Sequence, residues 1–382
     1  MKKLFGILLA VVMMFSVVAM VACSTDVVET GDIKVAMITD YGDITDQSFN
    51  QSTYEACKEW CDAQNVTFKY YKPENDSTEA RVASVNQAIE AGYNTIVMPG
   101  YAFGATVVEV AAANSDVKFI ALDVSQGDLG DNYTIPSNVT TFVYQEEYAG
   151  FMAGYAAVKE GYRHLGFLGG MAVPAVIRFG YGYVQGVNAA AKELNVTNDV
   201  TLEYVYGGKF FGTAKIDAAM ETWYTEKHVE VVFASGGGIY TSACKAATKD
   251  GINGKVIGVD SDQSYAINGT GEGKYGEDVC ITSAMKGLQP TVKTILSDLK
   301  AGKWNNYAGK VNNMGLVSGT DASLNYVQLP TATWSMKNFK VADYNTLVGK
   351  LFDKAEGFVV SGDTKAMPTV EITVNTYDTI EQ

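Results

Sequence analysis

The stretch IKVAMITDYGDITDQSFNQ, residues 33–51, decides how the fold is built. It opens with an apolar run that ends at a carboxylate, Asp40, and a helical pattern follows within a few residues. An uninterrupted apolar run is typical of a strand covered on both faces, as in a parallel sheet. A strand over 33–40 and a helix over 47–65 therefore predict a βα unit, the building block of an α/β fold.

The same βα step recurs along the chain in two series, and the 382 residues are enough for two domains. Beyond about residue 320 the pattern is harder to interpret, with strand-like runs at 325–330 and 369–376 around a helix at 343–358. The sequence predicts further strands at 66–73, 94–100, 117–123, 164–170, 200–208, 229–238, 254–260 and 277–287, and helices at 77–92, 103–115, 145–161, 176–194, 214–227, 242–251 and 288–304.

The first residues have the pattern of a secretory signal. A basic MKK precedes 19 apolar residues, and the small Ala22 stands directly before Cys23. We expect residues 1–22 to be a signal peptide, Cys23 to become a lipidated N-terminus and residues 23–31 to form a tether. The alternative is a transmembrane anchor, because the apolar run is long enough to span a bilayer.

Composition argues against several classes of function. The net charge of −14 disfavours a nucleic-acid groove or an anionic membrane surface as a partner. The four remaining cysteines and two histidines show no metal-ligand spacing, and SGGGIY (residues 235–240) is not a dinucleotide fingerprint. We therefore expect no metal, no cofactor and no enzymatic activity. A nucleoside hydrolase, the enzymatic alternative, would need a metal or a matched acid/base pair.

Polar residues or glycines follow the expected strands at their carboxyl ends, where ligands bind in open parallel sheets. Asp40, Asp123 and Asp260 end three strands, and a carboxylate can accept two hydrogen bonds from the vicinal hydroxyls of a sugar. Taken alone, Asp40 could equally be a turn residue or a helix cap, and we expect Asp46 to be a cap. The glycines of SGGGIY would let a ligand approach the backbone closely.

Two aromatic residues stand beside these strand ends, one in each half of the chain. Phe49 lies in the first turn of the helix expected at 47–65, and Phe210 follows the strand at 200–208. One ring from each half could hold a planar ligand between them, although Phe211 could point inward instead of Phe210. For Phe49 the alternative is a residue packed on the start of the helix.

The chain resembles the basic membrane protein family of bacterial lipoproteins, which includes purine nucleoside receptors of ABC transporters. The resemblance rests on DYGDITDQSFNQ, TIVMPGYAF, FIALD, GFLGGMAVPAVIRFGYGYVQG, IGVDSDQ and TSAMKG. It implies a type I periplasmic binding protein fold, with two Rossmann-like lobes and three crossover strands. The implied first lobe comprises residues 32–142 plus 283–320, and the second comprises 143–282 plus the tail, 321–382.

The resemblance also implies a function and a set of ligand residues. The protein would bind a purine nucleoside, pass it to an ABC transporter permease and stay attached to the cell membrane through the lipid on Cys23. Alternatives are a receptor for a sugar or an autoinducer on the same scaffold, and a sensor without transport. The residues carried over are Asp40, Phe49, Asn50, Asp123, Phe210, Gly237, Asp260 and Lys286.

Overall fold

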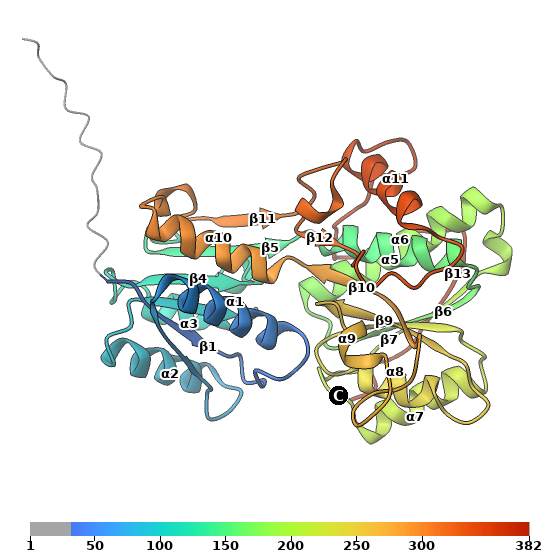
Figure 1. Cartoon of the computed structure of the whole chain (residues 1–382), viewed down its shortest axis with the longest axis horizontal. Coiled ribbons are helices and arrows are strands. Elements are labelled where there is room, and N and C mark those ends of the chain that lie inside the picture. Colours follow the sequence, from blue (N-terminus) through green and yellow to red (C-terminus); the bar gives the residue numbers. More distant parts are fainter. Residues whose placement is uncertain (1–31, 382) are drawn as a thin grey trace, which may run out of the picture.

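The computed structural model describes residues 32–381 of the chain. The expected signal peptide, the lipidation site Cys23 and the tether to residue 31 lie outside the described residues. Two α/β lobes stand side by side, each with a mainly parallel sheet between layers of helices (Figure 1). The expected fold class, an α/β protein of two Rossmann-like lobes, is confirmed. Within the described residues, no helix has the length and apolarity needed to cross a bilayer.

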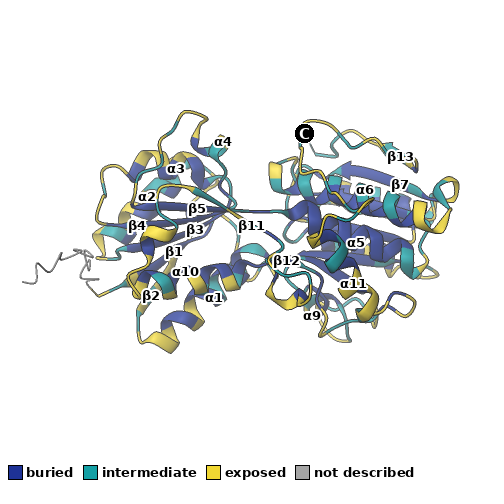
Figure 2. Cartoon of the chain, turned by 90° about the horizontal axis from the view of Figure 1, so that it is seen from above, coloured by how far each residue is buried: buried dark blue, intermediate teal, exposed yellow. Residues whose placement is uncertain are grey.

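The sheet of the first lobe is buried on both faces, as its apolar strands predict (Figure 2). Val35 and Met37 pack on the side of α1, while Ala36 and Ile38 pack on the side of α2 and α3. Alternate side chains of a strand point to opposite faces, so an unbroken apolar run fills two cores at once. In sheet order the strands are β11 (Val311–Met314), β5 (Val139–Tyr144), β4 (Lys118–Leu122), β3 (Thr95–Pro99), β1 (Lys34–Ile38) and β2 (Thr67–Tyr71), and the helices are α1 (Phe49–Gln64), α2 (Thr78–Glu90), α3 (Phe103–Val110), α4 (Gln126–Leu129) and α10 (Leu288–Lys300).

The second lobe repeats this arrangement with seven strands in its sheet, one more than in the first lobe. The short β12 pairs antiparallel with β10, and β13 pairs parallel with β7. In sheet order the strands are β12 (Val327–Gln328), β10 (Cys280–Lys286), β9 (Lys255–Asp260), β8 (Val231–Ser235), β6 (His164–Gly169), β7 (Thr201–Tyr206) and β13 (Thr373–Thr376), and the helices are α5 (Glu146–Glu160), α6 (Pro174–Leu194), α7 (Ala214–Thr225), α8 (Tyr240–Ala247), α9 (Ser264–Ile267) and α11 (Val341–Phe352).

The chain passes between the lobes at three places. It crosses at Gln145, between β5 and α5, at Gly287, between β10 and α10, and along residues 315–326, between β11 and β12. Two expected boundaries need correction. Residues 143–144 belong to β5 in the first sheet and residues 283–286 to β10 in the second, because each strand runs on to the crossing point. The strands β5 and β11 were not predicted from the sequence pattern.

Candidate ligand-binding site

A cavity of about 810 Å³ lies between the two lobes, at the carboxyl ends of their strands. Its walls come from both sheets, as expected for ligands that bind beyond the strand ends. The structure brings all of the residues predicted from sequence to this one cavity. Those residues are Asp40, Phe49, Asn50, Asp123, Phe210, Gly237, Asp260 and Lys286.

Asp40 is a turn residue as well as a cavity residue. Its Oδ1 accepts hydrogen bonds from the backbone N–H groups of Tyr41 and Gly42, at 2.5 and 2.6 Å, and from Asn50 Nδ2 at 3.1 Å. The turn interpretation therefore holds for one carboxylate oxygen, while Oδ2 makes no hydrogen bond to another described residue. Asp46 caps α1 as predicted, because its carboxylate accepts from the backbone N–H groups of Asn50 and Gln51.

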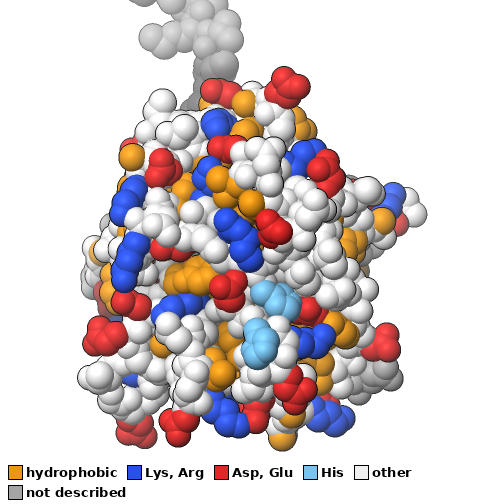
Figure 3. Space-filling model, turned by 90° about the vertical axis from the view of Figure 1, so that its right-hand side faces the viewer, with side chains coloured by type: hydrophobic (Ala, Val, Ile, Leu, Met, Phe, Trp, Pro, Cys, Tyr) orange, Lys and Arg blue, Asp and Glu red, His pale blue; other side chains and the backbone are white. Residues whose placement is uncertain are grey.

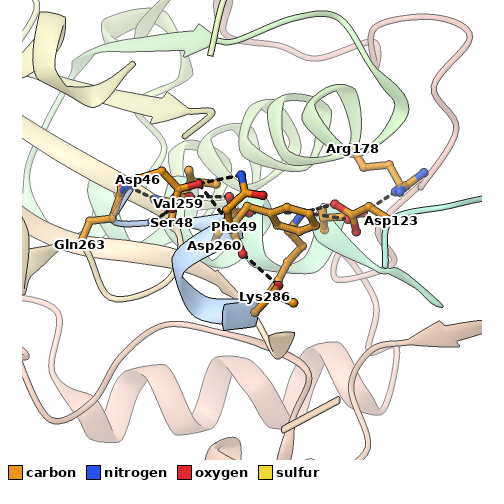
Figure 4. Close-up of polar contacts among 12 residues, drawn as sticks. Asp46, Ser48, Phe49, Asp123, Arg178, Val259, Asp260, Gln263 and Lys286 are labelled. Carbon is orange, nitrogen blue, oxygen red and sulfur yellow. Dashed lines mark hydrogen bonds and ion pairs between the residues drawn. The ribbon is translucent and has the colours of Figure 1, made fainter. Parts of the chain in front are cut away.

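Lys286 lies at the centre of a buried charge cluster (Figure 4). Its Nζ contacts a carboxylate oxygen of Asp123 and lies 3.2 Å from Asp260 Oδ1 and 3.8 Å from Glu146 Oε1. Burial opposes the charged ammonium, but these carboxylates outweigh it and raise the pKa of Lys286 above its usual value. The ammonium also lies 4.7 Å from the centre of the Phe49 ring, a cation–π distance. Lys286 therefore contacts both the carboxylates and the Phe49 ring.

Two of the carboxylates stand on unusual backbone. Asp123 has φ 56° and Asp260 has φ 64°, the left-handed region that non-glycine residues seldom adopt. Both residues come directly at the end of a strand, β4 and β9. Left-handed backbone at a non-glycine residue carries a free-energy cost and is concentrated at binding sites and turns. The two strand ends, one from each lobe, thus depart from the extended conformation where both carboxylates contact Lys286.

The two aromatic walls come from opposite lobes. Phe49 belongs to the first turn of α1, and Phe210 follows β7 in the second lobe. The Phe210 ring packs against Gly236, where an added Cβ would lie 2.9 Å from ring carbon Cδ1. Phe211 also lines the cavity, but 47% of its surface is exposed. The Phe210 ring therefore occupies space that a side chain at the neighbouring glycine would fill.

The sequence pattern did not predict two charged residues in and behind the cavity wall, Arg178 and Glu146. Arg178 lines the cavity from α6, and its Nε donates a 2.5 Å hydrogen bond to Glu146 Oε2 at the start of α5. Burial raises the pKa of Glu146 to about 7, although Arg178 opposes that shift. Arg178 stands among apolar residues in the helix expected at 176–194, and a buried charge needs a partner. That position could therefore have indicated an ion pair.

Hydrogen bonds connect the lobes beside the cavity. Ser48 Oγ donates to Asp260 Oδ2 at 2.7 Å, and Ser261 Oγ donates to the backbone oxygen of Gln47 at 3.0 Å. Gln263 Nε2 donates to the same oxygen at 3.3 Å. The segment that precedes α1 is thereby held against the end of β9.

The remaining candidate groups lie away from the cavity. The chain's two histidines are visible together on the surface of the second lobe (Figure 3), and neither lines the cavity. The cysteines 57, 61, 244 and 280 are buried and unpaired, and burial raises the pKa of each thiol. Residues 32–381 contain no group of three or more His, Cys, Asp or Glu side chains placed to hold a metal ion.

The cavity itself offers flat apolar faces, carboxylate acceptors and ammonium or guanidinium donors, which suits the binding of a polar, planar molecule.

Comparison with known proteins agrees with this geometry. In sequence, the chain is 28% identical over 286 residues to the ABC transporter nucleoside-binding protein BmpA of Lactococcus lactis subsp. cremoris, covering 72% of this chain and 76% of that protein. It is 28% identical over 294 residues to basic membrane protein A of Borreliella afzelii, covering 76% and 82% of the two chains. In structure, it is similar to a solute-binding protein of an ABC transporter system from Aeropyrum pernix K1, with a TM-score of 0.64, 19% identity and coverage of 87% and 88%.

A family description, "ABC transporter substrate-binding protein PnrA-like", matches residues 33–320, which include every cavity residue predicted above. The chain therefore belongs to the Bmp family of PnrA-like ABC transporter substrate-binding proteins.

Proposed function

We propose that this protein is a cell-surface lipoprotein that binds a purine nucleoside between its lobes and delivers it to an ABC transporter permease. The observation that carries the proposal is the pair of aromatic residues, Phe49 and Phe210, which reach one cavity from opposite lobes. A purine is flat and apolar on both faces, so two rings can enclose it. Stacking adds about 0.5–1.5 kcal/mol per aromatic contact beyond the burial of apolar area.

The polar groups of the cavity suit the ribose and the edge of the base. The Asp260 carboxylate and the Lys286 ammonium supply an acceptor and a donor for the ribose hydroxyls. Asp123 has one carboxylate oxygen, Oδ1, that is buried and has no hydrogen-bond partner among the described residues. An unpaired buried acceptor costs free energy, and an N–H group of a bound base would relieve that cost.

Binding closes the two lobes on the ligand. Only a closed form places Phe49 and Phe210 on the same molecule, so a nucleoside shifts the equilibrium between open and closed forms toward the closed one. The three crossings near the cavity form the hinge. The nucleoside is released to the permease unchanged, because the protein acts as a receptor and not as a hydrolase.

The comparison supports the class of ligand, since the Lactococcus lactis relative is named a nucleoside-binding protein. The Ala22–Cys23 boundary supports the lipid anchor. Metabolic labelling with palmitate tests the anchor: the wild-type chain should incorporate the label, and a Cys23→Ala variant should not.

Isothermal titration with guanosine, inosine and adenosine tests the ligand, with ribose and galactose as controls. We expect heat of binding with at least one nucleoside and none with either sugar. Mass spectrometry of molecules released from the purified, denatured protein gives an independent identification, and recovery of unchanged nucleoside after overnight incubation separates a receptor from a hydrolase. Binding of a sugar with no response to any nucleoside would contradict the proposal and favour the sugar receptor.

A further inference from the structure

We infer that the end of the chain, residues 373–381, positions the aromatic wall of the second lobe. This segment, here called the terminal strap, lies beyond residue 320, where the match to the family ends. It runs along the loop at 207–213, here called the Phe210 loop, which connects β7 to α7 and carries Phe210. The inference rests on the proposed function only in taking Phe210 to contact the ligand.

The terminal strap is anchored first on the sheet. β13 pairs with β7 from Thr373 to Thr376, so β7 is not an edge strand. Beneath the pairing, the buried carboxylate of Glu203 accepts hydrogen bonds from Asn375 Nδ2, at 3.1 Å, and from the hydroxyl of Tyr377. These contacts fix the direction in which the strap leaves the sheet.

The strap then reaches the Phe210 loop itself. The backbone N–H groups of Ile380 and Glu381 donate to the carbonyl oxygens of Tyr206 and Gly207, each at 3.0 Å. Gly208 has φ 81°, and a Cβ there would collide with the carbonyl oxygen of Glu381. The backbones of strap and loop are therefore in direct contact two residues before Phe210, which lines the cavity.

A side-chain clamp closes the far end of the loop. Glu381 Oε1 accepts a 2.7 Å hydrogen bond from Thr213 Oγ1, and Glu381 Oε2 lies 3.1 Å from Lys215 Nζ. Thr213 is also the N-cap of α7, where a negative charge is favourable. The hydrogen bond from Thr213 and the charge of Lys215 lower the pKa of Glu381.

The opposite side of the loop is held by glycines of the turns that follow β6 and β8. Gly208 N–H donates to Gly170 O at 2.9 Å, and Gly238 N–H donates to Phe210 O at 2.8 Å. The Phe210 loop is thus enclosed between these turns and the strap. Removing the strap would leave one side of the loop, including the backbone oxygens of residues 206 and 207, without its partner.

The first test needs no ligand. Hydrogen–deuterium exchange is compared between the wild type and a variant that ends at Thr379, with Glu381→Ala as a milder change in case the shortened chain folds poorly. The matched control is Glu371→Ala, a glutamate nearby in the chain whose pair with Lys192 is solvent-exposed. We expect faster exchange at residues 207–213 in the truncated and Glu381→Ala chains alone. Unchanged exchange in that loop would overturn the inference, whatever the protein binds.

The second test measures affinity for guanosine, inosine and adenosine by titration. Loss of correct stacking on Phe210 should raise Kd about 2- to 12-fold in the variant that ends at Thr379. The same truncation in a Phe210→Ala background should have no further effect, because the positioned ring is already gone. An equal loss in both backgrounds would show a general structural role and contradict the inference. A wild type that binds none of the three would count against the proposed function, and the exchange result would still decide the role of the strap.

Discussion

Glu146 shows how much of the site depends on single buried charges. It is fully buried, pairs with Arg178 and faces Lys286, and its Oε1 makes no hydrogen bond to a described residue. Burial raises its pKa from 4.5 to about 7. The carboxylate therefore changes charge near neutral pH directly behind Arg178 and Lys286, which line the cavity.

This shift predicts how stability varies with pH. Between pH 4.5 and 7 the folded chain holds a proton on Glu146 that the unfolded chain has lost. The free energy of unfolding should therefore fall as pH rises through this window, by on the order of 3 kcal/mol from this group. In denaturant unfolding, the free energy of unfolding of Glu146→Gln should fall less steeply with pH than that of the wild type. The altered pair with Arg178 changes this free energy by the same amount at every pH, so it does not affect the slope. Parallel pH profiles for the variant and the wild type would contradict the prediction.

The sequence left open whether Phe210 or Phe211 points into the cavity, and the two side chains differ in their packing. Phe210 packs against the glycines at 170 and 236, whereas Phe211 is 47% exposed. We expect Phe210→Ala to raise the Kd for nucleoside at least about tenfold, through lost stacking and lost apolar burial. Phe211→Ala is the matched control and should change Kd less than about threefold. A larger effect of Phe211→Ala in titration would mean that Phe211 is the stacking residue.

Among the helices, α5 and α6 pack with their backbones in contact. Gly150 of α5 lies against the Phe179 carbonyl of α6, and Gly182 of α6 lies against Glu147 of α5. An added Cβ at Gly182 would come within 2.7 Å of Glu147 Cα. This close packing sets the distance between Glu146 at the start of α5 and Arg178 on α6, so element packing determines a pair in the site.

Gly182→Ala should therefore disturb both stability and the site. The methyl group meets backbone that cannot rotate away, so the helices must separate, at a cost of about 1–3 kcal/mol or more. Gly127→Ala is the control, because a Cβ there would meet only Ser125 Oγ, at 3.7 Å. Thermal melts and nucleoside titration should both change for Gly182→Ala and not for Gly127→Ala. A Gly182→Ala variant as stable as the wild type would show that the helices can repack without cost.

For the whole molecule, the interlobe contacts beside the cavity determine how firmly the closed form is held. Ser48 of the first lobe donates to Asp260 of the second, so one carboxylate faces the cavity and also connects the lobes. The carbonyl oxygen of Gln47 receives two further hydrogen bonds from the segment after β9. These bonds form only when the lobes approach, and they therefore favour closure together with the ligand.

Ser48→Ala should weaken nucleoside binding because the closed form loses a hydrogen bond to a charged group. Such bonds contribute about 1.5–3 kcal/mol, so we expect Kd to rise at least about tenfold. Small-angle X-ray scattering should show a smaller contraction on adding nucleoside than in the wild type. Ser115→Ala, at an exposed turn of the first lobe away from the cavity and the three crossings, is the control. An unchanged Kd with full contraction would show that this bond has no part in closure.

The local pattern of strands, turns and helices could be predicted from residue order alone. Unbroken apolar runs identified most of the parallel strands, and the polar residue after each run identified the edge where a ligand would bind. Asp40, Asp123, Asp260 and Lys286 could be found in this way because strand, turn and carboxylate are neighbours in the chain. Local hydrogen bonding and burial on both faces of a strand depend on residues that are close in the chain, so they can be predicted from residue order.

The contacts between distant segments became visible in the three-dimensional fold. The strands β5 and β11, the crossing points at Gln145 and Gly287, and the pair Glu146–Arg178 depend on partners far away in sequence. The terminal strap docks on β7 from about 170 residues further along the chain. Periodicity reports which face of an element is apolar but not which element will cover it, because that choice is made by packing among segments that are remote in the chain.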